Sequence, residues 1–252
     1  MRPASLLTAV AAAFAMLHAL PAGADEIRIL SSPPARAILE AIAPGFEATA
    51  GHRLDAVYRT AFELRKEIDA GAVFDLAILP REVMDEVVGS GRVAAESRRA
   101  MARVPIGIGI RAGEPKPDIS TTAGFRQALL GARSFAYTQG AMSGRHVLEL
   151  IERLGIAEAM KPKLRMATGG TVAVALVSRG EVQMNVDLLP EMIRWPNVDI
   201  VGLLPAELRK DIRFEAGIAR DAKHGAAAAA LVAALAGADG IAAIKAHGML
   251  PE

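Results

Sequence analysis

The chain has 252 residues, with 29 Lys and Arg against 28 Asp and Glu, and it contains no Cys. The basic residues are scattered, which excludes the basic stripe that marks a nucleic-acid partner. The lack of Cys excludes disulfides, thiolate metal sites and a lipid-anchored cysteine. With 52% hydrophobic residues, the chain can build a core in one large domain or two small ones.

The first 24 residues have the form of a secretory signal. Arg2 supplies a short positive region, residues 6–20 are almost wholly apolar, and Pro21 precedes the small residues 22–24. A transmembrane anchor is the alternative, but a spanning helix needs about 20 apolar residues. We therefore expect residues 1–24 to be removed, and the mature protein to lie free in the periplasm without membrane insertion.

Short apolar strands then alternate with amphipathic helices. We expect strands at 26–30, 54–58 and 74–79. A helix follows each strand, the first ending at Gly51 and the last beginning at Pro80, because proline is tolerated at the first helical position. Strand and helix alternating at this spacing indicate a parallel sheet with right-handed crossovers.

A second series of the same kind follows residues 104–110, which we interpret as one strand crossing between two lobes. Strands are expected at 134–137, 164–167, 182–187 and 213–219, and helices at 144–154, 170–178, 226–235 and 240–246. The predicted fold is α/β with two lobes, each a mainly parallel sheet flanked by helices, joined by two crossover strands. Lobe 1 comprises residues 25–105 and 214–252, and lobe 2 is an insertion of residues 106–213. A single doubly wound sheet is the alternative.

Several segments, in this order and spacing, resemble the molybdate-binding-protein family of periplasmic receptors for ABC transporters, which have the type II periplasmic binding-protein fold. The segments that carry the resemblance are Ile29–Ser32, Pro44–Phe46, Leu64–Gly71, Phe74–Leu79, Ala175–Glu181, Pro205–Leu208 and Lys245–Met249. Together they span nearly all of the mature chain.

The resemblance implies an oxyanion site made of two serine hydroxyls, a tyrosine hydroxyl and backbone N–H groups at helix starts. Here the two serine positions fall at Pro34 and near Ala61, and the tyrosine position falls at Asp187 or Leu188. Proline has no N–H and alanine has no hydroxyl. The chain therefore resembles a divergent branch with another ligand, although molybdate or tungstate stays an alternative.

Two candidate segments lie at strand ends in lobe 1, because ligands of open α/β sheets bind beyond the carboxyl ends of strands. Ser31 and Ser32 can donate hydroxyls, although Ser32 could simply cap the next helix. The guanidinium of Arg59, which Thr60 follows, can donate two hydrogen bonds to one carboxylate, although Arg59 could equally be a surface arginine paired with an acid.

The candidates in lobe 2 follow the same logic. Ser143 and Arg145 lie where small residues open a helix, and Gly170 and Thr171 open the next one. By the family resemblance, Ser143 and Gly170 would offer backbone N–H groups. Each turn could also be an ordinary helix cap. Asp187 suits an amine and opposes a bare anion, so a carboxylate-bearing organic ligand would satisfy Arg59 and Asp187 together.

Catalysis, cofactors and metals are not expected. Ser143 and His146 are three residues apart, which places them on one helix face without implying a catalytic pair, and no nucleophile elbow occurs. The histidines lack the spacing of metal ligands.

We therefore predict a monomeric periplasmic solute-binding component of an ABC importer. It would hold a small anionic or carboxylate-bearing solute between its lobes and dock on a transporter permease. A molybdate-binding protein proper and a sensor module acting on a membrane signalling partner are the alternatives.

Overall fold

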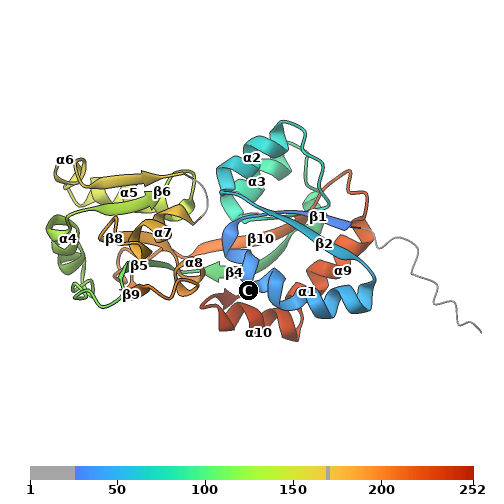
Figure 1. Ribbon diagram of the computed structural model, residues 1–252. Helices are drawn as coiled ribbons and strands as arrows, with labels where there is room; N and C mark the ends of the chain where they lie inside the picture. Colours follow the sequence, from blue (N-terminus) through green and yellow to red (C-terminus); the bar gives the residue numbers. More distant parts are fainter. Residues whose placement is uncertain (1–25, 169–170) are drawn as a thin grey trace, which may run out of the picture.

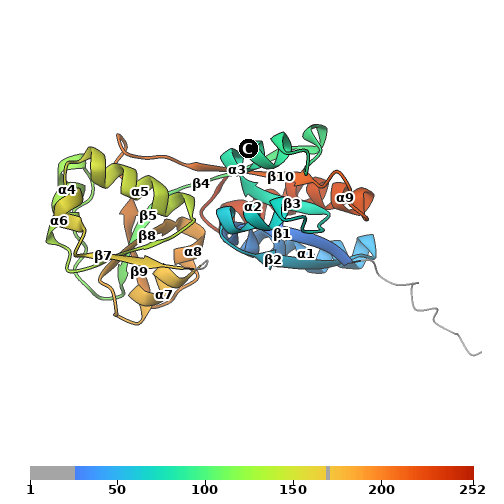
Figure 2. The ribbon, with the colours of Figure 1, turned by 90° about the horizontal axis from the view of Figure 1, so that it is seen from above.

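A computed structural model describes residues 26–168 and 171–252. The proposed signal segment and the candidate Gly170 lie outside these ranges. The described chain forms two lobes side by side, each built on one β-sheet with helices against it (Figures 1 and 2). The expected two-lobed α/β architecture is therefore confirmed.

The first lobe holds a six-stranded sheet in the order β11-β4-β10-β3-β1-β2. The strands are β1 (Glu26–Ser31), β2 (Arg53–Tyr58), β3 (Leu76–Pro80), β4 (Arg99–Val104), β10 (Ile212–Ile218) and β11 (Leu250–Pro251). The helices are η1 (Pro33–Ala35), α1 (Arg36–Ala50), α2 (Ala61–Asp69), α3 (Arg81–Gly89), η2 (Ala95–Ser97), α9 (Gly225–Ala236) and α10 (Ala238–Ala246).

The second lobe holds a five-stranded sheet in the order β7-β6-β8-β5-β9. Its strands are β5 (Ile106–Arg111), β6 (Phe135–Thr138), β7 (Leu164–Ala167), β8 (Met184–Leu188) and β9 (Val198–Leu203). The helices are α4 (Thr122–Gly131), α5 (Met142–Arg153), α6 (Ala157–Met160), α7 (Val172–Ser178) and α8 (Leu189–Ile193).

Both sheets are mixed. Strands joined through a helix pair in parallel, as β1 does with β2 and β3, and β6 with β7 and β8. The strands that enter or leave the lobes run the other way: β10 is antiparallel to β3, and β5 is antiparallel to β8 and β9. The parallel βα units that the sequence predicts thus account for part of each sheet, and the crossing strands for the rest.

The two lobes are joined at Pro105 and at residues 204–211 (Figure 1). The apolar run 104–110, expected to be a single crossing strand, is divided between β4 and β5 by Pro105, which has no N–H for a ladder hydrogen bond. The return passes from β9 to β10, which begins at Ile212. The sequence prediction lacked β9, although its apolar residues at positions 198, 200 and 201 resemble a strand.

Local sequence signals mark the end of α1 and the starts of α2 and α3 in the first lobe. Gly51 ends α1 with φ of 70°, a left-handed conformation that glycine adopts without steric cost. Thr60 and Glu63 form a reciprocal capping box that fixes the start of α2. Pro80 is the last residue of β3 and the cap of α3, one residue before its expected place as the first helical residue.

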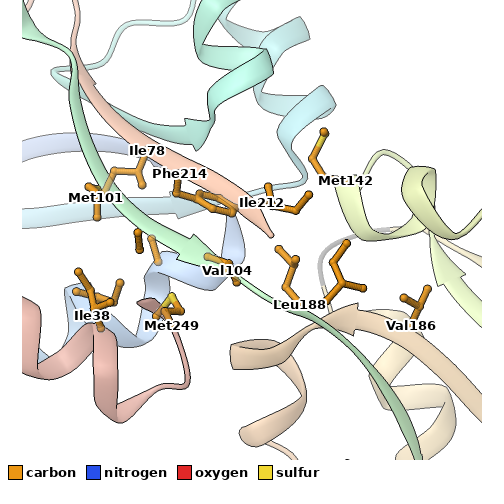
Figure 3. Close-up of a cluster of buried hydrophobic side chains, with 14 of the residues drawn as sticks. Ile38, Ile78, Met101, Val104, Met142, Val186, Leu188, Ile212, Phe214 and Met249 are labelled. Atoms are coloured by element: carbon orange, nitrogen blue, oxygen red, sulfur yellow. The ribbon is translucent and has the colours of Figure 1, made fainter. Parts of the chain in front are cut away.

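One apolar core continues from the first lobe into the second. Figure 3 shows Val104 and Ile212 on the crossing strands, with Leu188 and Met142 of the second lobe nearby. All four side chains are buried. These side chains leave little room for water, so a buried polar group beside them depends on the hydrogen-bond partners that the protein supplies.

No single helix among the described residues is both long and apolar enough to span a membrane. The pair α9 and α10, bent by 60°, meets that test on length and composition alone.

Candidate functional site

A small cavity of about 30 Å³ lies where the two lobes meet. The first lobe contributes hydroxyls, prolines and the start of a helix, and the second contributes a helix start and two carboxyl groups. The lining residues are Ser32, Pro33, Pro34, Thr60, Ala61, Pro80, Phe214, Ala141, Met142, Asp187, Leu188 and Glu191. A cavity of this size holds about one or two water molecules, so a larger ligand requires the lobes to separate.

The first-lobe wall presents neutral donors. Ser32 follows β1 and is 3% exposed, and its Oγ has no hydrogen-bond partner among the described residues. The start of α2 borders the cavity through Thr60 and Ala61. The first N–H groups of a helix have no partner within the helix and favour negative charge. This wall therefore suits an anionic oxygen.

The second-lobe wall has the same kind of helix start, together with a carboxyl group. Ala141 and Met142, where α5 begins, line the cavity. Asp187, near the end of β8, is 3% exposed. Its Oδ1 accepts a hydrogen bond from the Leu188 N–H at 2.8 Å and one from Ser143 Oγ at 3.4 Å. Its Oδ2 is buried without a hydrogen-bond partner among the described residues.

Two buried carboxyls thus face one cavity, and both bind protons more tightly than usual. Burial, together with the neighbouring charge of Glu191, raises the pKa of Asp187 to about 8, while the hydrogen bonds from Leu188 and Ser143 oppose that shift. Burial also raises the pKa of Glu191 to about 7, while Arg194 and Arg36 oppose that shift. Near neutral pH these groups exchange protons readily, so they can donate a hydrogen bond or accept a proton.

Two arginines, one from each lobe, act electrostatically on Glu191. Arg36, at the start of α1, lies over the ring of Tyr58 with 4.2 Å between Cζ and the ring centroid. Arg194, after α8, forms an ion pair of 3.5 Å with Glu40 of α1. This pair connects the two lobes beside the cavity, and surface pairs of this kind contribute roughly 0–1 kcal/mol.

Of the candidates predicted from the sequence, Ser32, Thr60 and Asp187 line the cavity. Ser143 does not line it, but its hydroxyl donates a hydrogen bond to Asp187. Ser31 is fully buried, and its hydroxyl donates to the Ser32 carbonyl at 3.0 Å. Its neighbour Ser32 therefore holds the available hydroxyl.

The remaining candidates lie away from this cavity. Arg59 has a half-exposed side chain that pairs with Glu67 at 3.7 Å. Arg145 is exposed and pairs with Glu149 at 3.2 Å. Both guanidiniums pair with acids on their own or the adjacent helix, and for Arg59 this is the surface alternative that the sequence left open. Thr171 precedes α7 and is half-buried, and it does not line the cavity.

Sequence reasoning missed Glu191. Pro190 shortly after the predicted strand was a usable signal, because proline is favoured in the first turn of a helix, and that turn would include Glu191. Here α8 begins directly after β8, so its first turn carries Glu191 back to the cavity. The resemblance was more informative: Pro34, Ala61, Asp187 and Leu188, where it placed the family's hydroxyl donors, all line the cavity.

Ser143 and His146, three residues apart in α5, do not contact each other through His146 Nε2. His146 Nε2 lies 2.9 Å from the Leu208 carbonyl, so this buried ring is held by the backbone rather than by Ser143. Within residues 26–168 and 171–252, no cluster of three or more His, Asp or Glu could hold a metal ion.

Comparison with known proteins gives relatives of two kinds. The chain is 31% identical over 231 residues to an aconitate isomerase of Pseudomonas sp., covering 89% of this chain and 87% of the relative. It is 21% identical over 218 residues to the molybdate-binding protein of Escherichia coli strain K12, covering 85% of each.

The fold is also found in solved structures. The periplasmic molybdate-binding protein of Azotobacter vinelandii superposes with a TM-score of 0.75 at 19% identity, covering 90% of this chain and 98% of that one. A sequence model of the bacterial extracellular solute-binding proteins matches residues 27–250, almost the whole described chain. The chain therefore belongs to the bacterial extracellular solute-binding protein family.

Proposed function

We propose that this protein binds a small organic carboxylate in the cavity between its lobes and presents it to the permease of an ABC importer. One observation carries the proposal. Two helix starts and the Ser32 hydroxyl, which has no partner among the described residues, line the same cavity as Asp187 and Glu191, two carboxyls that are easily protonated. Ligand carboxylates can accept from the helix N–H groups and the hydroxyl, while the protonated acids donate to further ligand oxygens.

A bare tetrahedral oxyanion fits this site less well. The positions of the family's serine donors hold Pro34 and Ala61, which offer no hydroxyl. A fully charged oxyanion also faces two acids, either of which repels it when ionised. Molybdate and tungstate are therefore the alternative ligands to test against organic acids.

The remaining parts of the role are proposals of the same kind. A signal segment at residues 1–24 would export the protein to the periplasm, where it would act as a monomer. Separation of the lobes about Pro105 and residues 204–211 would admit the solute, and closure would enclose it. Binding alone requires no covalent chemistry.

The test is a thermal-shift panel on the protein beginning at Asp25, with molybdate, tungstate, sulfate, phosphate and mono-, di- and tricarboxylates. A ligand at about 1,000 times its dissociation constant adds roughly 4 kcal/mol. For a chain of this size, that raises Tm by about 8–16 °C. A large shift with an organic acid supports the proposal. A shift with molybdate or tungstate alone contradicts it.

A second candidate function is isomerisation of aconitate, an unsaturated tricarboxylate. Two observations favour it: the 31% identity to a protein named aconitate isomerase, and the buried carboxyls of the cavity. The same site, once the lobes separate to admit the ligand, could bind and convert it. Incubation with cis-aconitate, followed by chromatography for trans-aconitate, tests this candidate. If cis-aconitate stays unchanged at high protein concentration, isomerisation is excluded and only the binding function remains.

A further inference from the structure

We propose that Asp187 is a catalytic residue that removes a proton from a carbon atom of a bound unsaturated tricarboxylate and returns it to another carbon. This inference rests on the second candidate function, and it identifies the group that carries the proton.

The two oxygens of Asp187 have different surroundings. Oδ1 is held by the Leu188 N–H at 2.8 Å and by Ser143 Oγ at 3.4 Å, one donor from its own chain segment and one from α5. Oδ2 has no hydrogen-bond partner among the described residues, and the residue lines the cavity. A carboxyl with one oxygen anchored and the other free is oriented for proton transfer without having to break a hydrogen bond first.

An unpartnered buried carboxyl oxygen is costly, because burial removes its hydration without supplying a partner. A purely structural role for Asp187 does not require a buried Oδ2 without a hydrogen-bond partner. The neighbouring α8 starts at Leu189, and only Oδ1 contacts the Leu188 N–H that precedes it. The free Oδ2 is therefore left for a group that enters the cavity.

The chemistry that this geometry permits is a proton shift across three carbons. In aconitate, a CH₂ group lies between a carboxylate and a C=C bond. Ionised Asp187 Oδ2 takes a proton from the CH₂: the C–H bond breaks, an O–H bond forms, and the electron pair spreads over the three-carbon unit. The double bond re-forms one position along as the proton returns to the far carbon. Atoms and electrons balance, and no oxidant or reductant is needed.

The cavity walls stabilise the charge that develops in this step. The starts of α2 and α5 meet the cavity through Ala61 and Met142. Their N–H groups favour negative charge on the ligand carboxylates, into which the electron pair of the intermediate delocalises. The Ser32 hydroxyl, which has no partner among the described residues, is a further donor.

The surroundings of Asp187 also tune its basicity. Burial raises its pKa to about 8, and the groups that act on it are Glu191 of α8, the Leu188 N–H and the Ser143 hydroxyl of α5. A carboxylate with this pKa is a much stronger base than an exposed one, and about half of it is ionised at pH 8. Glu191 is the rival base, but Arg194 and Arg36 oppose the effect of burial, so its pKa rises only to about 7 and it is the weaker base of the two.

The experiment follows aconitate by ¹H NMR in D₂O at pH 8, with the wild type, Asp187→Asn, Glu191→Gln and the control Glu158→Gln. Glu158 is exposed on α6 and pairs with Lys161 at 2.5 Å, away from the cavity. The binding of trans-aconitate is measured by calorimetry on each variant. The amide of Asn preserves the shape of Asp187 but cannot take a proton, so the comparison separates binding from proton transfer.

The wild type should isomerise aconitate, and deuterium enters the product to the extent that the Asp187 carboxyl exchanges its proton with D₂O before returning it. Asp187→Asn should still bind trans-aconitate but lose about 100-fold or more of the isomerisation rate. Glu158→Gln should match the wild type. Equal rates for Asp187→Asn and the wild type, or a loss confined to Glu191→Gln, would overturn the assignment of Asp187.

Failure of the underlying functions gives different results. Wild-type protein that binds aconitate tightly but neither isomerises it nor exchanges deuterium overturns this inference, while the binding proposal stands. Wild-type protein that binds no carboxylate overturns the binding proposal itself. If Asp187→Asn does not fold, Ser143→Ala takes its place. Loss of that hydroxyl removes one of the two hydrogen bonds to Asp187 Oδ1, and it should slow isomerisation several-fold without abolishing binding of trans-aconitate.

Discussion

The two walls of the cavity are built alike but equipped differently. Each ends a strand and begins a helix, at Thr60 for α2 and at Ala141 for α5. The first-lobe wall carries no ionisable side chain among its lining residues, whereas the second-lobe wall carries Asp187 and Glu191. The same backbone arrangement thus gives neutral donors on one side and groups able to transfer protons on the other. Substitutions in the first-lobe wall should therefore alter ligand binding, and substitutions in the second-lobe wall should alter proton transfer.

The largest expected effect comes from crowding the second wall. A Cβ added at Gly144, in the first turn of α5, would lie 2.4 Å from the Thr138 carbonyl oxygen and 3.2 Å from the Tyr137 ring. Gly144→Ala should therefore lower the free energy of unfolding by about 3 kcal/mol, and it should displace the helix start that borders the cavity.

Urea unfolding of Gly144→Ala measures this effect, and Gly131→Ala is its matched control. Gly131 lies in α4 with nothing within 4 Å of an added Cβ, so alanine there should be neutral or stabilise by up to about 1 kcal/mol. Equal effects at the two positions would show that the packing of α5 on β6 is looser than described.

The second prediction concerns pH and the acids of the second wall. Asp187 has a folded pKa of about 8 against an ordinary value of 3.8. Between these values the folded protein binds more protons than the unfolded chain, so stability should fall as pH rises from about 4 to 8. Each unit of pKa shift corresponds to about 1.4 kcal/mol.

Asp187→Asn cannot ionise, so its Tm should depend on pH much less than that of the wild type between pH 5 and 8. Differential scanning calorimetry of both proteins in matched buffers measures this difference. Parallel curves for the two proteins would show that Asp187 is already hydrated in the folded state.

The third prediction separates two neighbouring hydroxyls of the first wall. Ser32→Ala removes a buried hydroxyl without a described partner, so stability should change little while ligand affinity falls about five- to tenfold. Ser31→Ala removes a hydroxyl that donates to the Ser32 carbonyl, so it should cost about 1 kcal/mol of stability and little affinity. Titration calorimetry and urea unfolding of both variants give the two quantities. A reversed pattern would place the ligand on the other side of β1.

The smallest effect is expected at Arg59. Its half-exposed side chain pairs with Glu67 at 3.7 Å outside the cavity lining. Arg59→Ala should therefore change stability by less than about 0.5 kcal/mol and leave affinity nearly unchanged. The sequence alone left Arg59 open as a ligand-binding or a surface residue, so a large loss of affinity would mean that the arginine turns into the cavity when ligand binds.

The sequence predicted the fold better than the site. Strand and helix periodicity located most elements, and Gly51 marked the end of α1 correctly, because these signals are local. Site contacts depend on side-chain direction at strand ends, which periodicity does not encode. Arg59 directly follows β2 and Asp187 lies near the end of β8, yet only Asp187 lines the cavity. Glu191 was missed because its position depends on α8 beginning directly after β8.

The hydrogen bond from the Leu189 N–H to the Pro105 carbonyl, 2.9 Å long, ties the start of α8 to the connection between the lobes. A movement about Pro105 is therefore transmitted to the helix that carries Glu191 and adjoins Asp187. Opening that hydrates these carboxyls lowers their pKa toward ordinary values, so protons leave, and closure takes them back. Solute capture near neutral pH thus becomes coupled to the proton concentration of the compartment, and the heat of capture should vary with the ionisation enthalpy of the buffer.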